Sequence, residues 1–199
     1  MRIFAFTDIH ERMPLLARIR RIVARERVDV VVCSGDFTIF GRSTQKMLAA
    51  MNSLGAPLVL IHGNHEDESE VRSFLPLYPN IHFVHDAPVV LAGYTFLGFG
   101  GGGFSHIEPD LVALERRHAA IFNDRTVFLC HAPPYGTALD QVEEGWHTGN
   151  KSLVELVRRR KPILVLCGHI HECFHVHDEL AGTLMVNPGP DGEILDFDD

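Results

Sequence analysis

Five short apolar runs, separated by segments with helical periodicity, place the strongest constraint on how this chain can fold. The runs are rich in Val, Ile, Leu and Phe and lack polar alternation; they are residues 2–6, 29–33, 58–61, 126–130 and 163–167. This pattern predicts strands that are covered on both faces, as in the interior of an α/β sheet. Between the runs, apolar stripes at helical spacing predict helices within residues 15–23, 45–54, 109–121 and 151–160.

Two segments break this alternation and predict strands that pair locally. Residues 89–99 carry Gly93 between two apolar runs, which indicates a hairpin, and residues 174–187 and 193–197 are typical of further short strands. We therefore expect an α/β fold with a second, more antiparallel sheet. No linker, internal repeat or low-complexity segment is visible, so the 199 residues are expected to form one domain spanning 1–199.

Charge and cysteine content narrow the classes of function. The chain has 18 Lys and Arg against 26 Asp and Glu, a net charge of −8, which argues against a nucleic-acid binder with a broad basic surface. The apolar run at 3–6 is too short for a signal peptide, and no segment approaches the roughly 20 apolar residues of a membrane helix. The four cysteines lie in or beside apolar runs, so we predict buried thiols and a cytoplasmic location.

Polar side chains follow each of the five predicted strands, at the point where the strand ends. They supply carboxylates, one carboxamide and several imidazoles; the residues are Asp8, His10, Asp36, Asn64, His65, Glu66, His131, His169 and His171. In open α/β sheets the loops beyond the carboxyl ends of the strands converge on one crevice, where ligands bind. We therefore expect these side chains to form a single coordination site.

The donor set favours two transition metal ions over one. Too many nitrogen and oxygen donors converge for one tetrahedral ion, and the set fits Mn, Fe, Zn, Co or Ni better than a Cys-rich zinc site. Asp8 and His10, like His169 and His171, are separated by one residue, so an extended backbone would project both from the same face. Two metals about 3.5–4 Å apart can clamp a phosphoryl group and hold a bridging hydroxide for in-line attack.

The order of these motifs resembles the calcineurin-like metallophosphoesterases. Asp-x-His at 8–10, Gly-Asp at 35–36, Gly-Asn-His-Glu at 63–66, a later histidine at 131 and Gly-His-x-His at 168–171 appear in the order of the family pattern. The resemblance covers essentially the whole chain. It implies a four-layer fold, in which a sandwich of two mixed β-sheets is flanked by helices.

The resemblance also implies a role for each residue of the site. One metal ion would be held by Asp8, His10 and His171, the other by Asn64, His131 and His169, and Asp36 would bridge both. His65 would not be a ligand but would face the substrate, where it stabilises the phosphoryl oxygens or protonates the leaving alkoxide. This role suits an imidazole, because its charge changes near neutral pH.

The implied activity is hydrolysis of a phosphate ester by a metal-bridging hydroxide, with two divalent or trivalent ions as cofactors and a small phosphodiester as the preferred substrate. A nuclease or a phosphoprotein phosphatase of the same family, and a non-catalytic metal-binding interaction protein, are the alternatives. We expect neither a membrane nor nucleic acid as partner, except in the form of a nucleotide. Phe104, which follows the glycines at 100–103, and His147 are further candidates for substrate binding.

Overall fold

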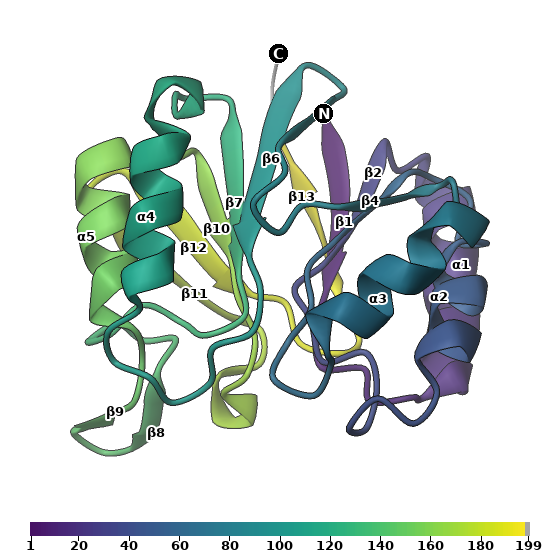
Figure 1. Ribbon diagram of the computed structural model, residues 1–199, viewed down its shortest axis with the longest axis horizontal. Coiled ribbons are helices and arrows are strands. Elements are labelled where there is room, and N and C mark those ends of the chain that lie inside the picture. The colour runs from purple at the N-terminus through teal and green to yellow at the C-terminus, as the bar shows by residue number, and fades with distance from the viewer. Residues whose placement is uncertain (198–199) are drawn as a thin grey trace.

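Two mixed β-sheets lie face to face at the centre of the molecule (Figure 1). The computed structural model describes residues 1–197. The strands of the first sheet have the order β13-β1-β2-β3-β4; they are β1 (Arg2–Phe6), β2 (Val30–Cys33), β3 (Leu58–Leu60), β4 (Ile81–Phe83) and β13 (Glu193–Asp196). Its outer face is covered by α1 (Met13–Glu26), α2 (Thr44–Met51) and α3 (Glu68–Phe74), the last continued by η1 (Leu75–Leu77).

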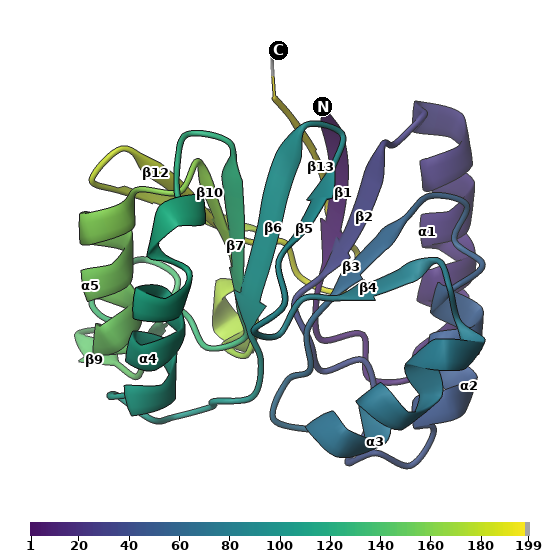
Figure 2. The ribbon, with the colours of Figure 1, turned by 45° about the horizontal axis from the view of Figure 1, so that its top comes forward.

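The second sheet has the order β11-β12-β10-β7-β6-β5 and carries helices on its own outer face (Figure 2). Its strands are β5 (Val89–Leu91), β6 (Tyr94–Phe99), β7 (Thr126–Cys130), β10 (Leu164–Leu166), β11 (Val176–Leu180) and β12 (Thr183–Asn187). The covering helices are α4 (Pro109–Arg117) and α5 (Lys151–Arg160). The remaining elements are short: η2 (Ala119–Ile121), the hairpin of β8 (Gln141–Glu143) and β9 (Trp146–His147), and η3 (His171–Cys173).

Both faces of the central strands are buried, which explains why the sequence shows no polar alternation there. In β1, Phe4 and Phe6 pack in the layer formed with α1 and α2, whereas Ile3 and Ala5 pack in the layer between the two sheets. A third apolar layer joins the second sheet to α4 and α5. Successive side chains of a strand point to opposite faces, so a strand with helices on one side and a sheet on the other must be apolar throughout.

The predicted two-sheet α/β architecture is confirmed, but the second sheet is not mainly antiparallel. Strands β12, β10, β7 and β6 run parallel, and only the edge strands β11 and β5 pair antiparallel with their neighbours. The prediction for residues 193–197 was wrong in its sheet, because β13 pairs antiparallel with β1 of the first sheet. Local pairing of hairpin strands is visible in sequence, whereas the sheet that a lone strand joins depends on tertiary packing.

One strand of the first sheet and one helix that covers it were not predicted from the sequence. Helix α3 has only seven residues, of which Val71 alone is buried, and β4 has three residues with His82 between two apolar neighbours. Neither is long enough to show a clear hydrophobic period.

The prediction for the cysteines is confirmed, since Cys33, Cys130, Cys167 and Cys173 are free and buried.

Within residues 1–197, no helix is both long and apolar enough to cross a bilayer. The cytoplasmic location stays a prediction.

Removing volume between the two sheets should destabilise the protein. Leu129 of β7 has no solvent exposure and lies in this layer. We expect Leu129→Ala to lower the free energy of unfolding by about 2–5 kcal/mol, because it removes buried methyl groups and leaves a cavity. Urea denaturation measures the loss. The control Leu77→Ala, at a side chain 60% exposed, should change stability by less than about 0.5 kcal/mol, and equal losses would contradict a packed inter-sheet layer.

Candidate metal centre

The carboxyl ends of five parallel strands from both sheets meet at one edge of the sandwich, opposite the N-terminus (Figure 1). Asp36, which follows β2, lies in the middle of the side chains there. Nε2 of His131 lies 3.4 Å from Asp36 Oδ1, and Nε2 of His10 lies 4.0 Å from Asp36 Oδ2. On the other side, Nε2 of His10 and of His171 lie 3.8 Å and 3.5 Å from Asp8 Oδ1.

The remaining predicted ligands lie beside His131. Oδ1 of Asn64 is 3.0 Å from His131 Nε2, and the ring centroids of His131 and His169 are 5.2 Å apart. Two triplets have ligand atoms all within 4.8 Å of one another: Asp8 with His10 and His171, and Asp8 with Asp36 and His131. The structure thus brings all seven predicted metal-binding residues into one cluster, with Asp36 between its two halves.

Backbone carbonyl groups orient two of the imidazole rings. Nδ1 of His10 lies 3.0 Å from the carbonyl oxygen of Thr38, and Nδ1 of His131 lies 2.9 Å from that of Ser34. A carbonyl oxygen only accepts hydrogen bonds, so Nδ1 is the donor in both rings. Nε2 is therefore the nitrogen that faces the carboxylates, which is the arrangement found when a histidine binds a metal ion.

The cluster contains buried polar atoms that make no hydrogen bond among the described residues. Oδ2 of Asp8 accepts hydrogen bonds from the Thr7 hydroxyl at 2.8 Å and the His169 backbone N–H at 3.1 Å. Oδ1 of Asp8 and Nε2 of His169 are buried without any hydrogen-bond partner. Leaving such atoms unpaired is unfavourable, and a coordinated cation would satisfy both. The residues present therefore fit the metal ions that the sequence predicts.

The pKa values show how strongly the charges in the cluster interact. Burial acts to raise the pKa of Asp36, but the hydrogen bond and charge of His131 outweigh it and lower the pKa to about 2. Burial likewise opposes protonation of His131, yet Asp36 and Asp8 raise its pKa to about 9. Burial and the charge of His131 lower the pKa of His169 to about 4. The opposite shifts of Asp36 and His131 show that this buried site favours positive charge beside the two carboxylates.

The expectation that the paired ligands lie on extended backbone was wrong. Asp8, His10 and His169 have φ values of 51°, 42° and 70°, and Asp36 has 49°, all in the left-handed region. For non-glycine residues this conformation costs about 1–3 kcal/mol each and occurs where function demands it. The side chains do converge, but because the chain turns sharply at each strand end and not because alternate residues of a strand share a face.

Close approach of the loops requires glycine at two motif positions. A Cβ atom on Gly63 would overlap the Asp36 carboxylate and backbone, and one on Gly168 would overlap Thr7 and the Asp8 carboxylate. These glycines let the loops of neighbouring strands pack directly against the two carboxylates.

Glu66 holds the β2 and β3 loops together, a role that the sequence does not reveal. Its buried carboxylate accepts hydrogen bonds from the backbone N–H of Asp36 at 3.0 Å, of Gly63 at 2.8 Å and of Thr38 at 2.8 Å, and from the Thr38 hydroxyl at 2.7 Å. Burial and the charge of Asp36 raise the pKa of Glu66, while these hydrogen bonds act in the opposite direction. In the sequence, only its place as the last residue of the Gly-Asn-His-Glu motif marks Glu66 as part of the site.

His65 lies beside Asp36 at the rim of the cluster. Its backbone N–H donates to Asp36 Oδ1 at 3.0 Å, and its Nε2 lies 3.8 Å from Asp36 Oδ2. The ring centroid lies 4.8 Å from that of His10 and 4.2 Å from that of Phe40, with which it is stacked. His65, His10 and Asp36 form a third triplet within metal-binding distance, so the imidazole is placed to act either on a substrate or as a ligand.

The two candidate substrate-binding residues are placed differently. The Phe104 ring is exposed and its centroid lies 4.5 Å from that of His169, at the edge of the cluster. His147 turns toward a separate loop network, in which its Nδ1 lies 2.7 Å from Asp140 Oδ1 and its ring contacts Tyr135. Only Phe104 therefore contacts a predicted metal-binding residue.

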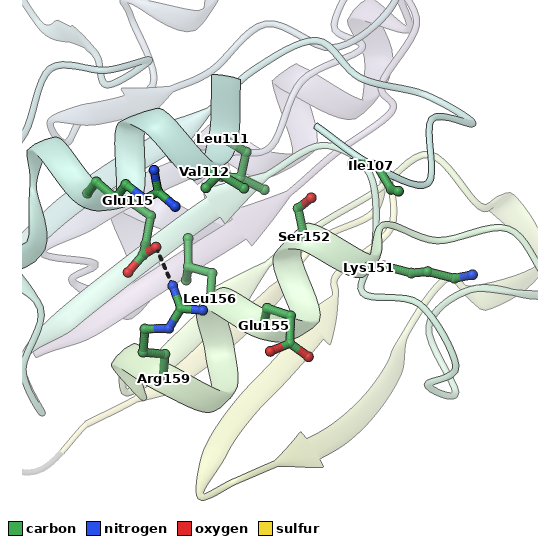
Figure 3. Close-up of a pocket in the computed structure, with 10 residues that line it drawn as sticks. Ile107, Leu111, Val112, Glu115, Lys151, Ser152, Glu155, Leu156 and Arg159 are labelled. Carbon is green, nitrogen blue, oxygen red and sulfur yellow. Dashed lines mark hydrogen bonds and ion pairs between the residues drawn. The ribbon is translucent and has the colours of Figure 1, made fainter. Parts of the chain in front are cut away.

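A separate cavity of about 300 Å³ lies between α4 and α5 (Figure 3). Leu111 and Leu156 line its apolar part, and an ion pair of 2.9 Å between Arg159 and Glu115 borders it. None of the seven predicted metal-binding residues lines this cavity. It is therefore distinct from the cluster at the strand ends.

A sandwich of two sheets, with carboxylates and imidazoles gathered at the strand ends, is typical of metal-dependent phosphoesterases. Residues 1–173 match the family model for calcineurin-like phosphoesterases, and the chain belongs to this family. The crystal structure of TT1561 from Thermus thermophilus shares the fold, with a TM-score of 0.76 and 17% sequence identity over 96% of this chain and 89% of that one.

Two curated relatives are similar in sequence. The chain is 26% identical over 195 residues to UPF0046 protein K07C11.7 of Caenorhabditis elegans, which covers 86% of this chain and 64% of the relative. It is 29% identical over 161 residues to the glycerophosphodiester phosphodiesterase GpdQ of Enterobacter lignolyticus strain SCF1, covering 74% and 57%. The chain thus spans less than two thirds of the length of either relative.

Neutralising Glu66 should weaken the join between the two loops. In Glu66→Gln one carboxylate oxygen becomes an amide group that faces backbone N–H donors, so we expect the free energy of unfolding to fall by about 2 kcal/mol. Urea denaturation in the presence of a chelator measures this without a contribution from metal binding. The matched control Glu155→Gln, on the exposed surface of α5, should leave stability unchanged, and an equal loss in both variants would contradict the role of Glu66.

Proposed function

We propose that this chain is a binuclear metal-dependent phosphoesterase, that its preferred substrate is a small phosphodiester, and that residues 1–199 form a single domain of this kind. The observation that carries the proposal is the convergence of seven potential ligands, with Asp36 in their middle, from the strand ends of both sheets. Such a site is far larger than one ion needs.

The proposed ligands divide into two sets that share Asp36. Asp8, His10 and His171 would hold one ion, in agreement with the triplet that their ligand atoms form. Asn64, His131 and His169 would hold the other. Imidazole, carboxylate and amide donors without thiolate suit Mn, Fe, Zn, Co or Ni. Two divalent ions with the carboxylates of Asp8 and Asp36 would leave a local charge near +2, which would attract a phosphate to an acidic protein.

When bound, the two ions would supply Lewis-acid stabilisation of the phosphoryl oxygens and acidify the attacking water. The residues of the chain would do the rest. Asp36 would fix the backbone of His65 through the hydrogen bond that it accepts from the His65 N–H. The His65 imidazole would then donate a hydrogen bond to the phosphoryl group or a proton to the departing oxygen.

Two observations support a small diester as substrate. The relative from Enterobacter lignolyticus is a glycerophosphodiester phosphodiesterase by name, and it matches 74% of this chain. The net charge of −8 opposes the approach of a long polyanion, which counts against a nuclease.

The binuclear site predicts both metal content and activity. Purified protein should bind two transition metal ions per chain, and Asp36→Ala should lose most of this metal because it removes the shared ligand. We expect the Asp36→Ala rate on bis(p-nitrophenyl) phosphate to fall at least about a hundredfold. Elemental analysis and a colorimetric assay measure the two effects. Asp110→Ala, at an exposed carboxylate of α4, is the control. A protein without metal, or full activity in Asp36→Ala, would refute the proposal.

His65 should act on the substrate and not on the metal ions. We expect His65→Ala to lower kcat by about 10²–10⁴-fold while metal content stays at two per chain. If the imidazole protonates the leaving oxygen, the loss should be larger for an alkoxide than for p-nitrophenolate, which leaves without a proton. His82→Ala on β4 serves as the control. Loss of metal from His65→Ala would instead identify His65 as a ligand.

A further inference from the structure

Two of the most exposed apolar side chains of the described residues border the metal-binding cluster. Phe40 is 72% exposed and Phe104 is 67% exposed, and each contacts a histidine of the site. They come from different sheets, since Phe40 follows β2 and Phe104 follows β6. Exposed aromatic rings that gather at one site are typical of ligand binding, whereas scattered ones need no explanation.

Phe40 is held over His65 by a strained but well-anchored loop. The two rings are 4.2 Å apart at an angle of 15°, which is a stacked arrangement. The backbone of Phe40 has a φ of 49°, an unfavourable value for a bulky residue. The loop is fixed on both sides of this residue, because Thr38 binds Glu66 and the Gly41 N–H donates to the Thr38 hydroxyl at 3.2 Å.

Phe104 reaches the cluster at the end of a glycine loop. The loop starts from fixed points, since the Gly100 N–H donates to His85 Nδ1 at 2.8 Å and the Gly101 N–H donates to the His62 carbonyl at 2.9 Å. Gly101 to Gly103 then have φ values of 75°, 92° and 104°, a path that other residues rarely follow. It delivers the Phe104 ring to within 4.5 Å of the His169 ring, at an angle of 60°.

We propose that Phe40 and Phe104 are specificity-determining residues that bind planar aromatic groups on the two sides of a phosphodiester, which therefore carries a nucleobase or an aryl ester. This inference rests on the proposed function. Phe40 lies against His65, the proposed proton donor, so it contacts the leaving group; Phe104 lies against His169 and contacts the group that stays on phosphorus. A glycerol ester offers neither ring a planar face, so the preferred substrate differs from the one named for the Enterobacter relative.

Two diesters with the same leaving group isolate the contribution of Phe104. Phenyl p-nitrophenyl phosphate and methyl p-nitrophenyl phosphate differ only in the group that stays on phosphorus. We expect wild-type kcat/KM to favour the phenyl compound by about tenfold, the size of one aromatic stacking contact. Phe104→Ala should bring this ratio close to one, and Phe104→Tyr should restore it. A wild-type ratio near one, or an equal loss on both compounds in Phe104→Ala, would overturn the assignment.

Phe40 should act on both diesters alike, because both release p-nitrophenolate. Phe40→Ala is expected to lower kcat/KM about tenfold for each and to leave the phenyl-to-methyl ratio unchanged, and Phe40→Tyr should recover the rate. Val90→Ala, at an exposed side chain of the edge strand β5, should alter neither compound. A changed phenyl-to-methyl ratio in Phe40→Ala would contradict the assignment of Phe40 to the leaving group and of Phe104 to the group that stays on phosphorus.

Equilibrium binding separates this inference from the proposed function. Phenylphosphonate and methylphosphonate are not esters, so calorimetry on the metal-loaded protein tests ring recognition without turnover. We expect phenylphosphonate to bind about tenfold more tightly, and the preference to vanish in the double variant Phe40→Ala/Phe104→Ala. If the protein hydrolysed neither diester, the proposed function would be refuted, but recognition by Phe40 and Phe104 would not. If the two phosphonates bound equally to the wild type, recognition of planar groups by Phe40 and Phe104 would be refuted, whatever the activity.

Discussion

The structure depends on buried polar contacts between groups that follow strands of different sheets. Asp36 follows β2 of the first sheet, and its carboxylate lies 3.4 Å from Nε2 of His131, which follows β7 of the second. Asp8, at the end of β1, accepts the backbone N–H of His169 beyond β10 at 3.1 Å. The apolar layer between the sheets sets how closely these strand ends approach. The geometry of the site therefore depends on the packing of the two sheets, because a shift of one sheet against the other would separate the carboxylates from their partners.

The site is built from backbone that is unfavourable on its own. Asp8, His10, Asp36 and His169 all take left-handed φ values, and the backbone N–H of each donates a hydrogen bond to a group of another loop. Glu66 is the clearest case, since one carboxylate fixes N–H groups of the β2 loop and of the β3 loop at once. Such over-determined loops place side chains with little freedom, which the proposed site for two cations would require. The strain that they store is opposed by the rest of the fold.

Much of this arrangement could be predicted from the sequence, for a definite physical reason. Strands covered on both faces are apolar throughout, so β1, β2, β3, β7 and β10 stand out, and the polar residues that follow them mark the strand ends. The prediction fails where tertiary contact decides. The sheet joined by β13, the turn at His10 and the function of Glu66 each depend on a neighbour distant in sequence. Phe40 gave no signal either, because an isolated aromatic residue in a loop has no periodicity.

The charge of the proposed metal site and the exposed rings beside it favour the same kind of substrate. The cluster contains the carboxylates of Asp8 and Asp36 among neutral donors, including the amide of Asn64, so bound divalent ions would keep a net positive charge. That attraction is short-ranged, because salt screens exposed charges beyond about 8–10 Å. The net charge of −8 would also repel a long polyanion more strongly than a small ester. Exposed rings on both sides of the cluster would add contact area for planar groups of that size. A small diester with an aromatic group satisfies both conditions, and a polymer or a purely polar ester satisfies at most one.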